Sequence, residues 1–242
     1  MSERERGLGF LGGIGLTHLT VYEQRAAPDG VMSGCAHVHA ITDEAYYVLS
    51  GTGAVELHDA EFGFRSVRLA RGSFVQFPPG TIHRTVSSGA LEVLAIMGNA
   101  GLPEHGDARI YFGSAVDDDP PEFERLTALP RTRGLEGALE RRDASVRAYM
   151  ELLTLWRRDR DAYRVELERF VSLHARSVAA RRAEIEGLIR AGPARWSELA
   201  LARLATPGIS GVPKSGLARE DDTTPRLGMC GTLRQYHGLT PV

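Results

Sequence analysis

The chain has 242 residues, of which 43% are hydrophobic and 25% charged, values typical of a globular protein that buries a core. Its length allows one large domain, or one domain with an appended module. The formal net charge of -2 at pH 7 gives no reason to expect nucleic acid or an anionic membrane as a partner.

The first half of the chain has the pattern of short strands separated by turns. Runs rich in β-branched and aromatic residues alternate with clusters of Gly, Pro, Asp and Ser, which predict turns, among them Ser50-Gly51 and Ser88-Gly89. The predicted strands are 16–23, 35–40, 44–49, 53–57, 64–69, 73–77, 81–86 and 91–97. Many short strands at nearly even spacing predict a sandwich or small barrel, which we assign to a domain over residues 1–113.

Two histidines and a glutamate lie close together within these strands. Gly30 is followed after six residues by His37 and His39, after four more by Glu44, and after another six by Gly51. Alternate side chains on a strand share a face, so the two imidazoles are expected to point the same way. The four-residue step lets the chain turn and present the carboxylate from the next strand.

A third histidine follows in a second element. Gly72 is followed after five residues by Pro78-Pro79-Gly80 and after two more by His83, so a rigid turn presents this imidazole from the returning strand. The predicted ligands of one divalent metal ion are His37, His39, Glu44 and His83. Three neutral nitrogens and one carboxylate suit iron(II), manganese(II), nickel(II) or zinc. Such a set leaves open positions for water, substrate or oxygen, as a catalytic metal requires.

The two elements resemble the two conserved motifs of the cupin superfamily, the small double-stranded β-barrel proteins related to germins. The match covers residues 30–87 directly and about 14–113 by strand pattern. Six residues rather than five separate Gly30 from His37, and Ser87 stands where asparagine is common. The resemblance implies a jelly-roll barrel with the metal inside. It does not fix the reaction, because cupins include dioxygenases, isomerases, decarboxylases, lyases, cyclases and non-enzymatic sugar-binding modules.

Two further side chains are predicted to line the pocket. Cys35 precedes His37 by two residues and Tyr46 follows Glu44 by two, so each is expected to face the barrel interior. Cys35 is either a substrate-side thiol or, as we favour, a small buried apolar residue. The Tyr46 hydroxyl either orients a substrate or is satisfied locally.

From about residue 122 the sequence becomes helical in character. No glycine or proline occurs between Ala138 and Glu186, and Ala, Leu, Arg and Glu dominate. Large apolar residues recur at steps of three and four over 149–170. This periodicity predicts one long amphipathic helix, or two helices joined near 159–161.

The segments around this helix are assigned from composition. Residues 114–137 are predicted to be a linker, and Gly192-Pro193 to end the long helix before a short one over 194–205. Residues 138–205 then form a helical module that packs on the barrel or on its twin in a homodimer. Residues 206–242 are rich in Gly, Pro and Thr, and are predicted to be a disordered tail or an arm laid over a partner.

The remaining features concern the compartment and the other histidines. Two cysteines do not make a disulfide framework, and no segment resembles a signal peptide or a membrane span, so we expect a cytoplasmic protein. Three histidines have no partner at ligand spacing and are predicted to lie on the surface: His105, His174 and His237.

Three functions are consistent with these features. The first is a mononuclear metal-dependent enzyme, an iron(II) oxygenase or dioxygenase acting on a small organic molecule, aromatic or amphipathic because the other interior residues are mostly apolar. The second is a non-redox isomerase, lyase or cyclase that uses the ion as a Lewis acid. The third is a ligand-sensing module whose helical segment binds a partner. The complete ligand set favours an enzyme, because a sensor does not need it.

Overall fold

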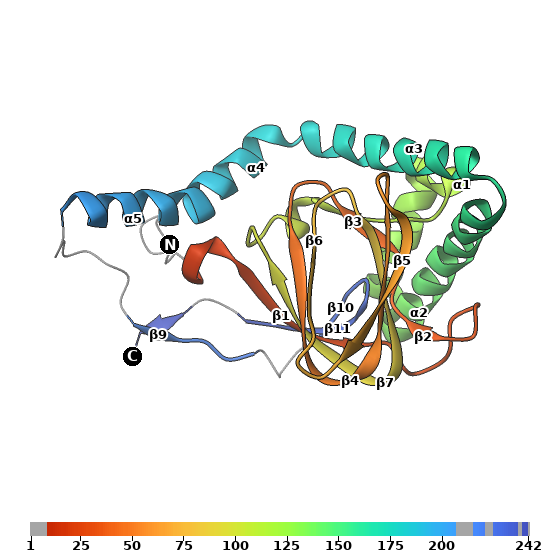
Figure 1. Ribbon diagram of the computed structural model, residues 1–242, viewed down its shortest axis with the longest axis horizontal. Coiled ribbons are helices and arrows are strands. Elements are labelled where there is room, and N and C mark those ends of the chain that lie inside the picture. Colours follow the sequence, from red (N-terminus) through yellow and green to blue (C-terminus); the bar gives the residue numbers. More distant parts are fainter. Residues whose placement is uncertain (1–8, 207–214, 221–224, 237–238, 242) are drawn as a thin grey trace.

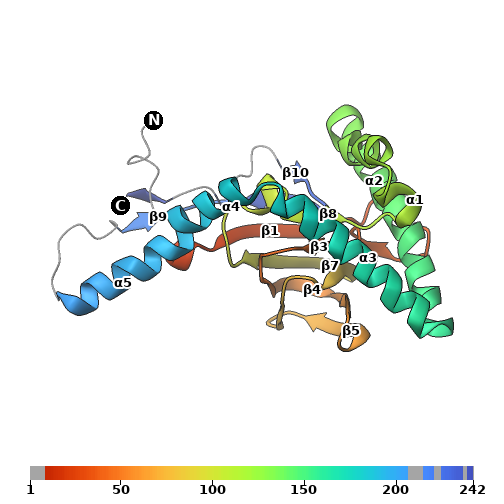
Figure 2. The same ribbon diagram turned by 90° about the horizontal axis from the view of Figure 1, so that it is seen from above.

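A computed structural model describes residues 9–206, 215–220, 225–236 and 239–241 (Figure 1). Antiparallel strands form a barrel, and the long helices lie along one side of it (Figures 1 and 2). This arrangement confirms the predicted fold class of an N-terminal β-barrel followed by a helical region. The strands of the first half are β1 (Gly15–Val21), β2 (Met32–Ser33), β3 (His37–His39), β4 (Glu44–Asp59), β5 (Gly63–Ala70), β6 (Phe74–Phe77), β7 (Ile82–Met97) and β8 (Ala108–Ile110).

Two long strands, β4 and β7, build most of the barrel. They pair antiparallel from Glu44↔Met97 to His58↔Ile82, with register shifts in the middle. The sequence predicted turns at 50–51 and 88–89, but both strands continue through these positions because their mutual pairing resumes on the far side. Gly51 makes the bend possible: its φ is 75°, and a Cβ there would lie 2.0 Å from a backbone carbonyl oxygen of β7. Each strand thus contributes to both halves of the barrel.

The barrel interior is filled by every second residue of its strands. The apolar residues buried together there are Leu19, Val21, Tyr46, Val48, Val55, Leu57, Leu69, Phe77, Leu91, Val93, Ala95 and Cys230. This alternation is the period of two expected for strands with one buried face. All but the last of these residues come from the predicted barrel domain.

The predicted linker over residues 114–137 is helical instead. Helix α1 (Ser114–Asp117) is followed by α2 (Pro120–Arg158), whose first turn carries the two prolines. Proline is tolerated in a first turn, and the Asp119 carboxylate caps the helix by accepting from the Glu122 amide at 3.3 Å. Gly134, at φ 56° and ψ -139°, is non-helical and separates two helical segments that fold back on each other, since Leu129 packs in one cluster with Ala144. Proline therefore marks the start of a helical segment here and glycine a tight turn between two of them, not a flexible linker.

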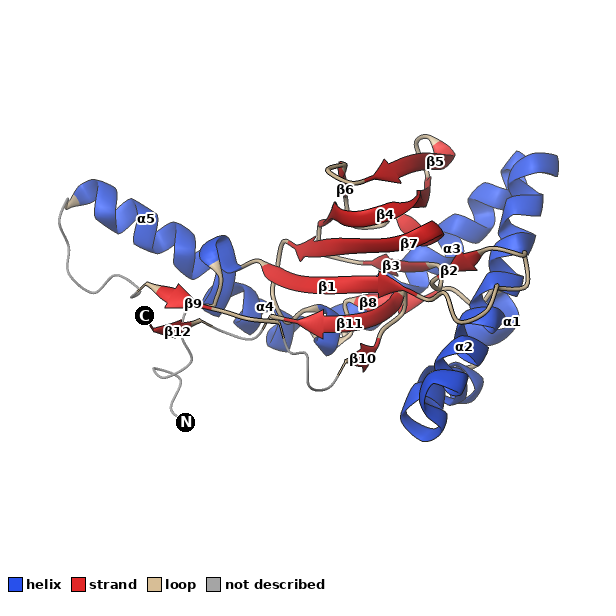
Figure 3. Cartoon of the chain, turned by 90° about the horizontal axis from the view of Figure 1, so that it is seen from below, coloured by secondary structure: helices blue, strands red, loops and turns tan. Residues whose placement is uncertain are grey.

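Helices α2 and α3 (Arg160–Ala179) meet at Asp159, which confirms the expected junction. The Asp159 carboxylate caps α3 by accepting from the Ala162 amide at 2.9 Å. The apolar face of the pair packs on the outside of the barrel (Figure 3). The residues buried in this contact are Ala36, Val38, Ile82, Tyr111, Ala148, Tyr149, Leu152, Tyr163, Leu167 and Phe170. The helical region thus packs on the barrel of its own chain.

The helical path continues past Gly192-Pro193. Helix α4 (Arg182–Ile189) runs through a π-helical turn (Arg190–Ala194) into α5 (Arg195–Ala205). The predicted stop is absent because Pro193 lies within the π turn. No residue of α5 is buried within the described part of the chain. None of the helices described is long and apolar enough to cross a membrane.

Part of the predicted tail belongs to the barrel. Strands β10 (Arg226–Leu227) and β11 (Gly231–Gln235) form a hairpin, and β11 pairs antiparallel with β1. The expectation of a disordered or partner-covering tail is therefore wrong for this segment, because β11 satisfies the backbone edge that β1 would otherwise expose. Strands β9 (Gly216–Leu217) and β12 (Thr240–Pro241) pair with each other. The rest of the predicted tail, residues 207–214, 221–224, 237–238 and 242, lies outside the described residues.

Candidate metal centre

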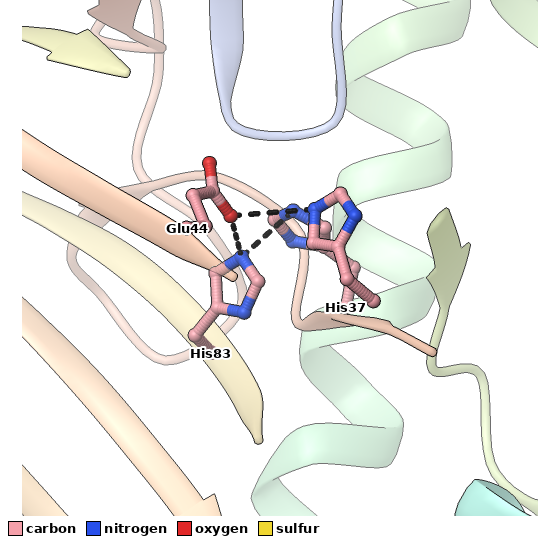
Figure 4. Close-up of side chains that lie close together, drawn as sticks. His37, Glu44 and His83 are labelled. Atoms are coloured by element: carbon pink, nitrogen blue, oxygen red, sulfur yellow. Dashed lines mark hydrogen bonds and ion pairs between the residues drawn. The ribbon is translucent and has the colours of Figure 1, made fainter. Parts of the chain in front are cut away.

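The four predicted ligands come together inside the barrel. His37 and His39 lie on β3, Glu44 begins β4, and His83 is the second residue of β7. Each is buried, and one ligand atom from each lies within 4.8 Å of the other three. Figure 4 shows His37, Glu44 and His83 pointing toward one another from different strands. Strand pairing produces this convergence, since His37 is directly opposite His83.

The tautomers of His37 and His83 follow from their outer contacts. The Nδ1 atom of His37 lies 3.3 Å from the Cys35 carbonyl oxygen, and that of His83 lies 3.2 Å from the Thr81 carbonyl oxygen. Carbonyl oxygens only accept, so both Nδ1 atoms carry the hydrogen and both Nε2 atoms carry lone pairs. These two Nε2 atoms are 2.9 Å apart. Facing lone pairs repel, and a cation between them removes the conflict.

The other two ligands fit a metal ion equally well. The Glu44 Oε2 atom lies 3.0 Å from His83 Nε2 and 3.3 Å from His39 Nε2. Within the described part of the chain, Oε2 of Glu44 and Nε2 of His39 are buried without a hydrogen bond of normal geometry. Buried polar atoms of this kind are costly unless a partner binds them. The cluster of three imidazoles and a carboxylate therefore fits a divalent metal site, whose metal the geometry does not identify.

Asp107 orients the third imidazole, and the sequence analysis missed it. Its Oδ2 atom accepts from His39 Nδ1 at 3.0 Å, while Oδ1 accepts from the Ala40 and Ile41 amides at 3.1 and 2.7 Å. Carboxylates that hold the far nitrogen of a ligand histidine are typical of metal sites. Asp107 is 68 positions from His39 in the chain, so no local spacing indicated it.

The pKa values of the metal-free site reflect burial and mutual charge. Burial, together with His83 and His39, holds the pKa of His37 well below its usual range. Burial alone would lower the pKa of His39, but the carboxylates of Asp107 and Glu44 outweigh it and raise the pKa to about 9. Burial would raise the pKa of Glu44, but His83 and His39 hold it well below its usual range. The metal-free site therefore holds a proton on His39, which a metal ion displaces.

A cavity of about 250 Å³ opens onto three of the four ligands. The rest of its wall is mostly apolar, and it is smaller than the roughly 300–1,000 Å³ typical of drug-sized ligands. The non-ligand side chains and glycine that line it are Thr17, Leu19, Tyr46, Ala95, Met97, Pro103, Glu104, Ala108, Arg226, Leu227, Gly228, Met229, Cys230, Leu233 and Gln235. The β10–β11 hairpin contributes almost half of these residues.

Contacts to β1 and α2 hold this hairpin against the barrel. The Gly228 carbonyl oxygen accepts from the Tyr22 hydroxyl at 2.8 Å and from the Arg141 guanidinium at 2.5 Å. The turn of the hairpin lies beside the metal ligands (Figure 4). The pocket is therefore assembled from both ends of the chain, which the sequence analysis did not predict.

Cys230, not the predicted Cys35, lines the cavity. Cys35 does not line the cavity but packs between the barrel and α2, in a cluster with Ile110, Phe112, Leu126 and Leu129. Cys35 lies before the start of β3, and its amide donates to the Met229 carbonyl oxygen at 2.9 Å. The alternation of side chains along β3 therefore does not extend from His37 to Cys35. Cys230 lines the cavity instead, with its Sγ atom 3.7 Å from His37 Nδ1.

Tyr46 does lie in the cavity wall, as expected. Its ring contacts Phe77 edge-on at 5.4 Å and lies 6.3 Å from the His83 ring. Its hydroxyl lies near Thr85 and Cys230 but makes no hydrogen bond of normal geometry within the described residues. Burial is the main reason that its pKa lies well above the usual range, so the hydroxyl stays protonated. A buried, unpartnered O–H group in the cavity is available to a ligand.

The three histidines predicted on the surface differ from one another. His174 is buried, with 2% of its surface exposed, because it lies on the face of α3 that packs on the barrel. Its predicted surface position is therefore wrong. His105 is half-exposed, and His237 lies outside the described residues.

Comparisons with known proteins come from one family model and from solved structures. A model described as a cupin domain matches residues 22–97. A comparison with curated protein sequences finds no match. QdtA, a sugar 3,4-ketoisomerase from Thermoanaerobacterium thermosaccharolyticum, is 12% identical with a TM-score of 0.32, over 39% of this chain and 64% of that one. A cupin protein from Bacteroides fragilis is 20% identical with a TM-score of 0.27, over 37% and 68%.

A third solved structure is WlaRA, a TDP-fucose-3,4-ketoisomerase from Campylobacter jejuni. It is 8% identical with a TM-score of 0.31, over 38% of this chain and 64% of that one. This chain therefore spans slightly less than two thirds of the length of either ketoisomerase.

Proposed function

Residues 22–97 of this chain belong to the cupin superfamily, and from this premise we propose that the protein is a mononuclear metal-dependent enzyme, an iron(II) oxygenase acting on a small organic molecule. The observation that carries the proposal is the complete set of three histidines and one glutamate, three of which line a mostly apolar cavity. An ion with open coordination positions in such a cavity serves a reaction, whereas a structural ion is usually closed off by protein ligands.

The four ligands and their outer contacts have separate roles. His37, His39 and His83 would hold the metal through their Nε2 atoms, and Glu44 through its carboxylate. A bound iron(II) ion would supply a site at which substrate and oxygen are activated together. The surrounding side chains exclude water and hold the ligand imidazoles in one orientation.

Charge favours an anionic substrate. A divalent ion with three neutral imidazoles and one carboxylate leaves one net positive charge on the ion and its ligands, which the Asp107 carboxylate balances only from the far side of the His39 ring. A substrate with one anionic oxygen, such as a phenolate, enolate or carboxylate, neutralises this charge. Apart from the metal ligands, the described cavity wall has one cationic side chain, Arg226, and one anionic one, Glu104, so the preference for an anion rests on the metal site. The Glu104 carboxylate is engaged by Gln235 Nε2 at 2.7 Å.

The size and chemistry of the wall define the remainder of the substrate. Leu19, Met97 and Leu233 offer an apolar surface, so most of the molecule is a ring or short hydrocarbon. The Tyr46 hydroxyl can donate one hydrogen bond to a substrate oxygen beside the metal. We therefore propose a small aromatic or enolic monoanion as the substrate class.

Oxygen consumption tests this proposal. Protein loaded anaerobically with iron(II) is mixed with a panel of small phenolates, enolates and aromatic carboxylates, and oxygen uptake is recorded. Substrate-dependent uptake that Glu44→Ala abolishes and Asp43→Ala retains would support the oxygenase, because Asp43 is the exposed acidic neighbour of the buried ligand. Turnover of a panel compound without oxygen would instead indicate a non-redox isomerase, lyase or cyclase. Tight binding without any turnover would indicate a ligand-sensing module.

A further inference from the structure

His174 connects the helical region to the metal centre. It lies on α3, fully enclosed, and its Nε2 atom donates to the Asp107 carbonyl oxygen at 2.5 Å. Since a carbonyl only accepts, Nε2 carries the hydrogen. Burial lowers the pKa of His174, so the ring is neutral and holds this tautomer at neutral pH.

Asp107 in turn fixes the segment that carries His39. Its carboxylate accepts from His39 Nδ1 and from the amides of Ala40 and Ile41, and its carbonyl oxygen also accepts from the Ala40 amide at 3.1 Å. Both the side-chain carboxylate and the backbone carbonyl oxygen of Asp107 therefore accept hydrogen bonds. A shift of this residue would move the imidazole of His39 with it.

The C-terminal part of α3 and α4 pack on the same segment. Val178 and Ile185 are buried together with Leu102, and the half-buried side chains of Ala40 and Ile41 pack against them. Apolar packing and the hydrogen bond from His174 thus hold residues 39–41 and Asp107 from the same side.

The other two ligand histidines do not depend on the helices in this way. The Nδ1 atoms of His37 and His83 contact carbonyl oxygens only two residues earlier in their own chain segments, at 3.3 and 3.2 Å. The contact of His39 to Asp107 is shorter, at 3.0 Å, and joins segments far apart in sequence. His39 is therefore the ligand histidine whose Nδ1 atom hydrogen-bonds to an oxygen of a distant segment.

We propose that Asp107 and His174 are positioning residues through which α3 sets the orientation of His39, so that docking of α3 and affinity for the metal are coupled. By linkage, metal binding stabilises the docking of α3 through these two residues, and loss of their hydrogen bonds weakens metal binding by the same free energy. Contacts of α3 that do not reach Asp107 leave the metal affinity unchanged. This coupling goes beyond the proposed function, because it requires only that the four ligands bind an ion and holds for any reaction.

The test measures metal affinity rather than turnover. Cobalt(II) is titrated into metal-free protein, and its visible absorption spectrum reports both the dissociation constant and the ligand geometry. We expect Asp107→Asn to weaken cobalt binding by roughly 10–100-fold, as a change in an outer partner of a ligand does. His174→Leu, one contact further from the metal, is expected to weaken it in the same direction, and both variants to shift the spectrum. His174→Gln retains an N–H donor and is expected to restore part of the affinity.

Tyr163→Phe is the matched control on the same helix. Its hydroxyl contacts His58 and lies away from Asp107, so this variant is expected to lose stability while keeping the wild-type cobalt affinity and spectrum. In hydrogen exchange, zinc binding is expected to protect α3 amides in wild type more than in His174→Leu.

Three results would overturn the proposal. One is a wild-type dissociation constant and spectrum in Asp107→Asn or His174→Leu. Another is equal weakening by Tyr163→Phe, which would reduce the effect to general destabilisation. The third is zinc protection of α3 that is the same in wild type and His174→Leu. Failure of wild type itself to bind cobalt would remove the metal site, and with it both this inference and the proposed function, whereas absent turnover would affect only the latter.

Discussion

His58 is expected to make the fold sensitive to acid. It is fully buried between the barrel and the helices, with Nε2 3.0 Å from the Tyr149 hydroxyl and Nδ1 3.0 Å from the Tyr163 hydroxyl. The Tyr149 hydroxyl donates to the Glu56 carboxylate at 2.8 Å, so His58 Nε2 donates to Tyr149, and Nδ1 accepts from Tyr163. The neutral ring is thereby satisfied at both nitrogens, and burial lowers its pKa to about 3.

The sign and size of the effect follow from linkage. An unfolded histidine titrates near pH ~6.5, so between about pH 6.5 and 3 the unfolded chain binds a proton that the folded chain does not. The stability that neutral His58 provides is complete above pH ~6.5 and is lost as the pH falls toward 3. At pH 5.0, about 1.5 units below the pKa of an unfolded histidine, the free energy of unfolding is lowered by about 2 kcal/mol.

Urea unfolding at pH 7.5 and 5.0 measures this loss, with a chelator present so that metal binding does not contribute. Wild type is expected to lose about 2 kcal/mol more than His58→Gln between the two pH values, although the variant is less stable at both. Other titrating groups are shared by the two proteins and cancel in the comparison. Equal losses in wild type and His58→Gln would refute the assignment of a buried neutral histidine.

Three further predictions address the bend, the site and the assembly. Gly51→Ala is expected to cost more than about 2 kcal/mol in urea unfolding, because its Cβ would meet a carbonyl oxygen at 2.0 Å. Gly72→Ala, also at positive φ but with nothing described within 4 Å, should cost only about 1–2 kcal/mol; equal costs would contradict the close approach. Zinc binding at pH 7.5 is expected to release about one proton, from His39, measured by calorimetry in two buffers of different ionisation enthalpy; no release would contradict its raised pKa. The homodimer expected from the sequence predicts about twice the chain mass of 26.4 kDa in light scattering, and a monomer mass would exclude it.

The metal ligands could be predicted because each of the two elements that carry them has a local pattern. His37 and His39 share a face through the period of two on a strand, and the Pro-Gly turn before His83 fixes the return of the next strand. The amphipathic helices were also predictable from the spacing of their apolar residues, which pack on the barrel as expected.

The parts that sequence reasoning missed depend on contacts between distant segments. Asp107 reaches His39 from a loop, and Cys230 enters the cavity on a hairpin whose composition indicated a tail. The glycine at position 51 was interpreted as a turn, although the pairing of β4 with β7 makes it a bend within one strand. Gly134 was interpreted as part of a linker, whereas it forms a tight turn between two helical segments of α2. At Gly51, therefore, tertiary pairing overrides a local turn signal, whereas at Gly134 the turn is real and only the helices on either side were missed.

Metal content is the most direct test of the central claim, that His37, His39, Glu44 and His83 bind one divalent ion. Protein purified anaerobically without a chelating tag is analysed by inductively coupled plasma mass spectrometry. We predict close to one ion per chain in wild type and in Asp43→Ala, and its loss in Glu44→Ala and His83→Ala. Folded wild-type protein that contains no metal and takes up none on incubation with iron(II), manganese(II), nickel(II) or zinc would contradict the account.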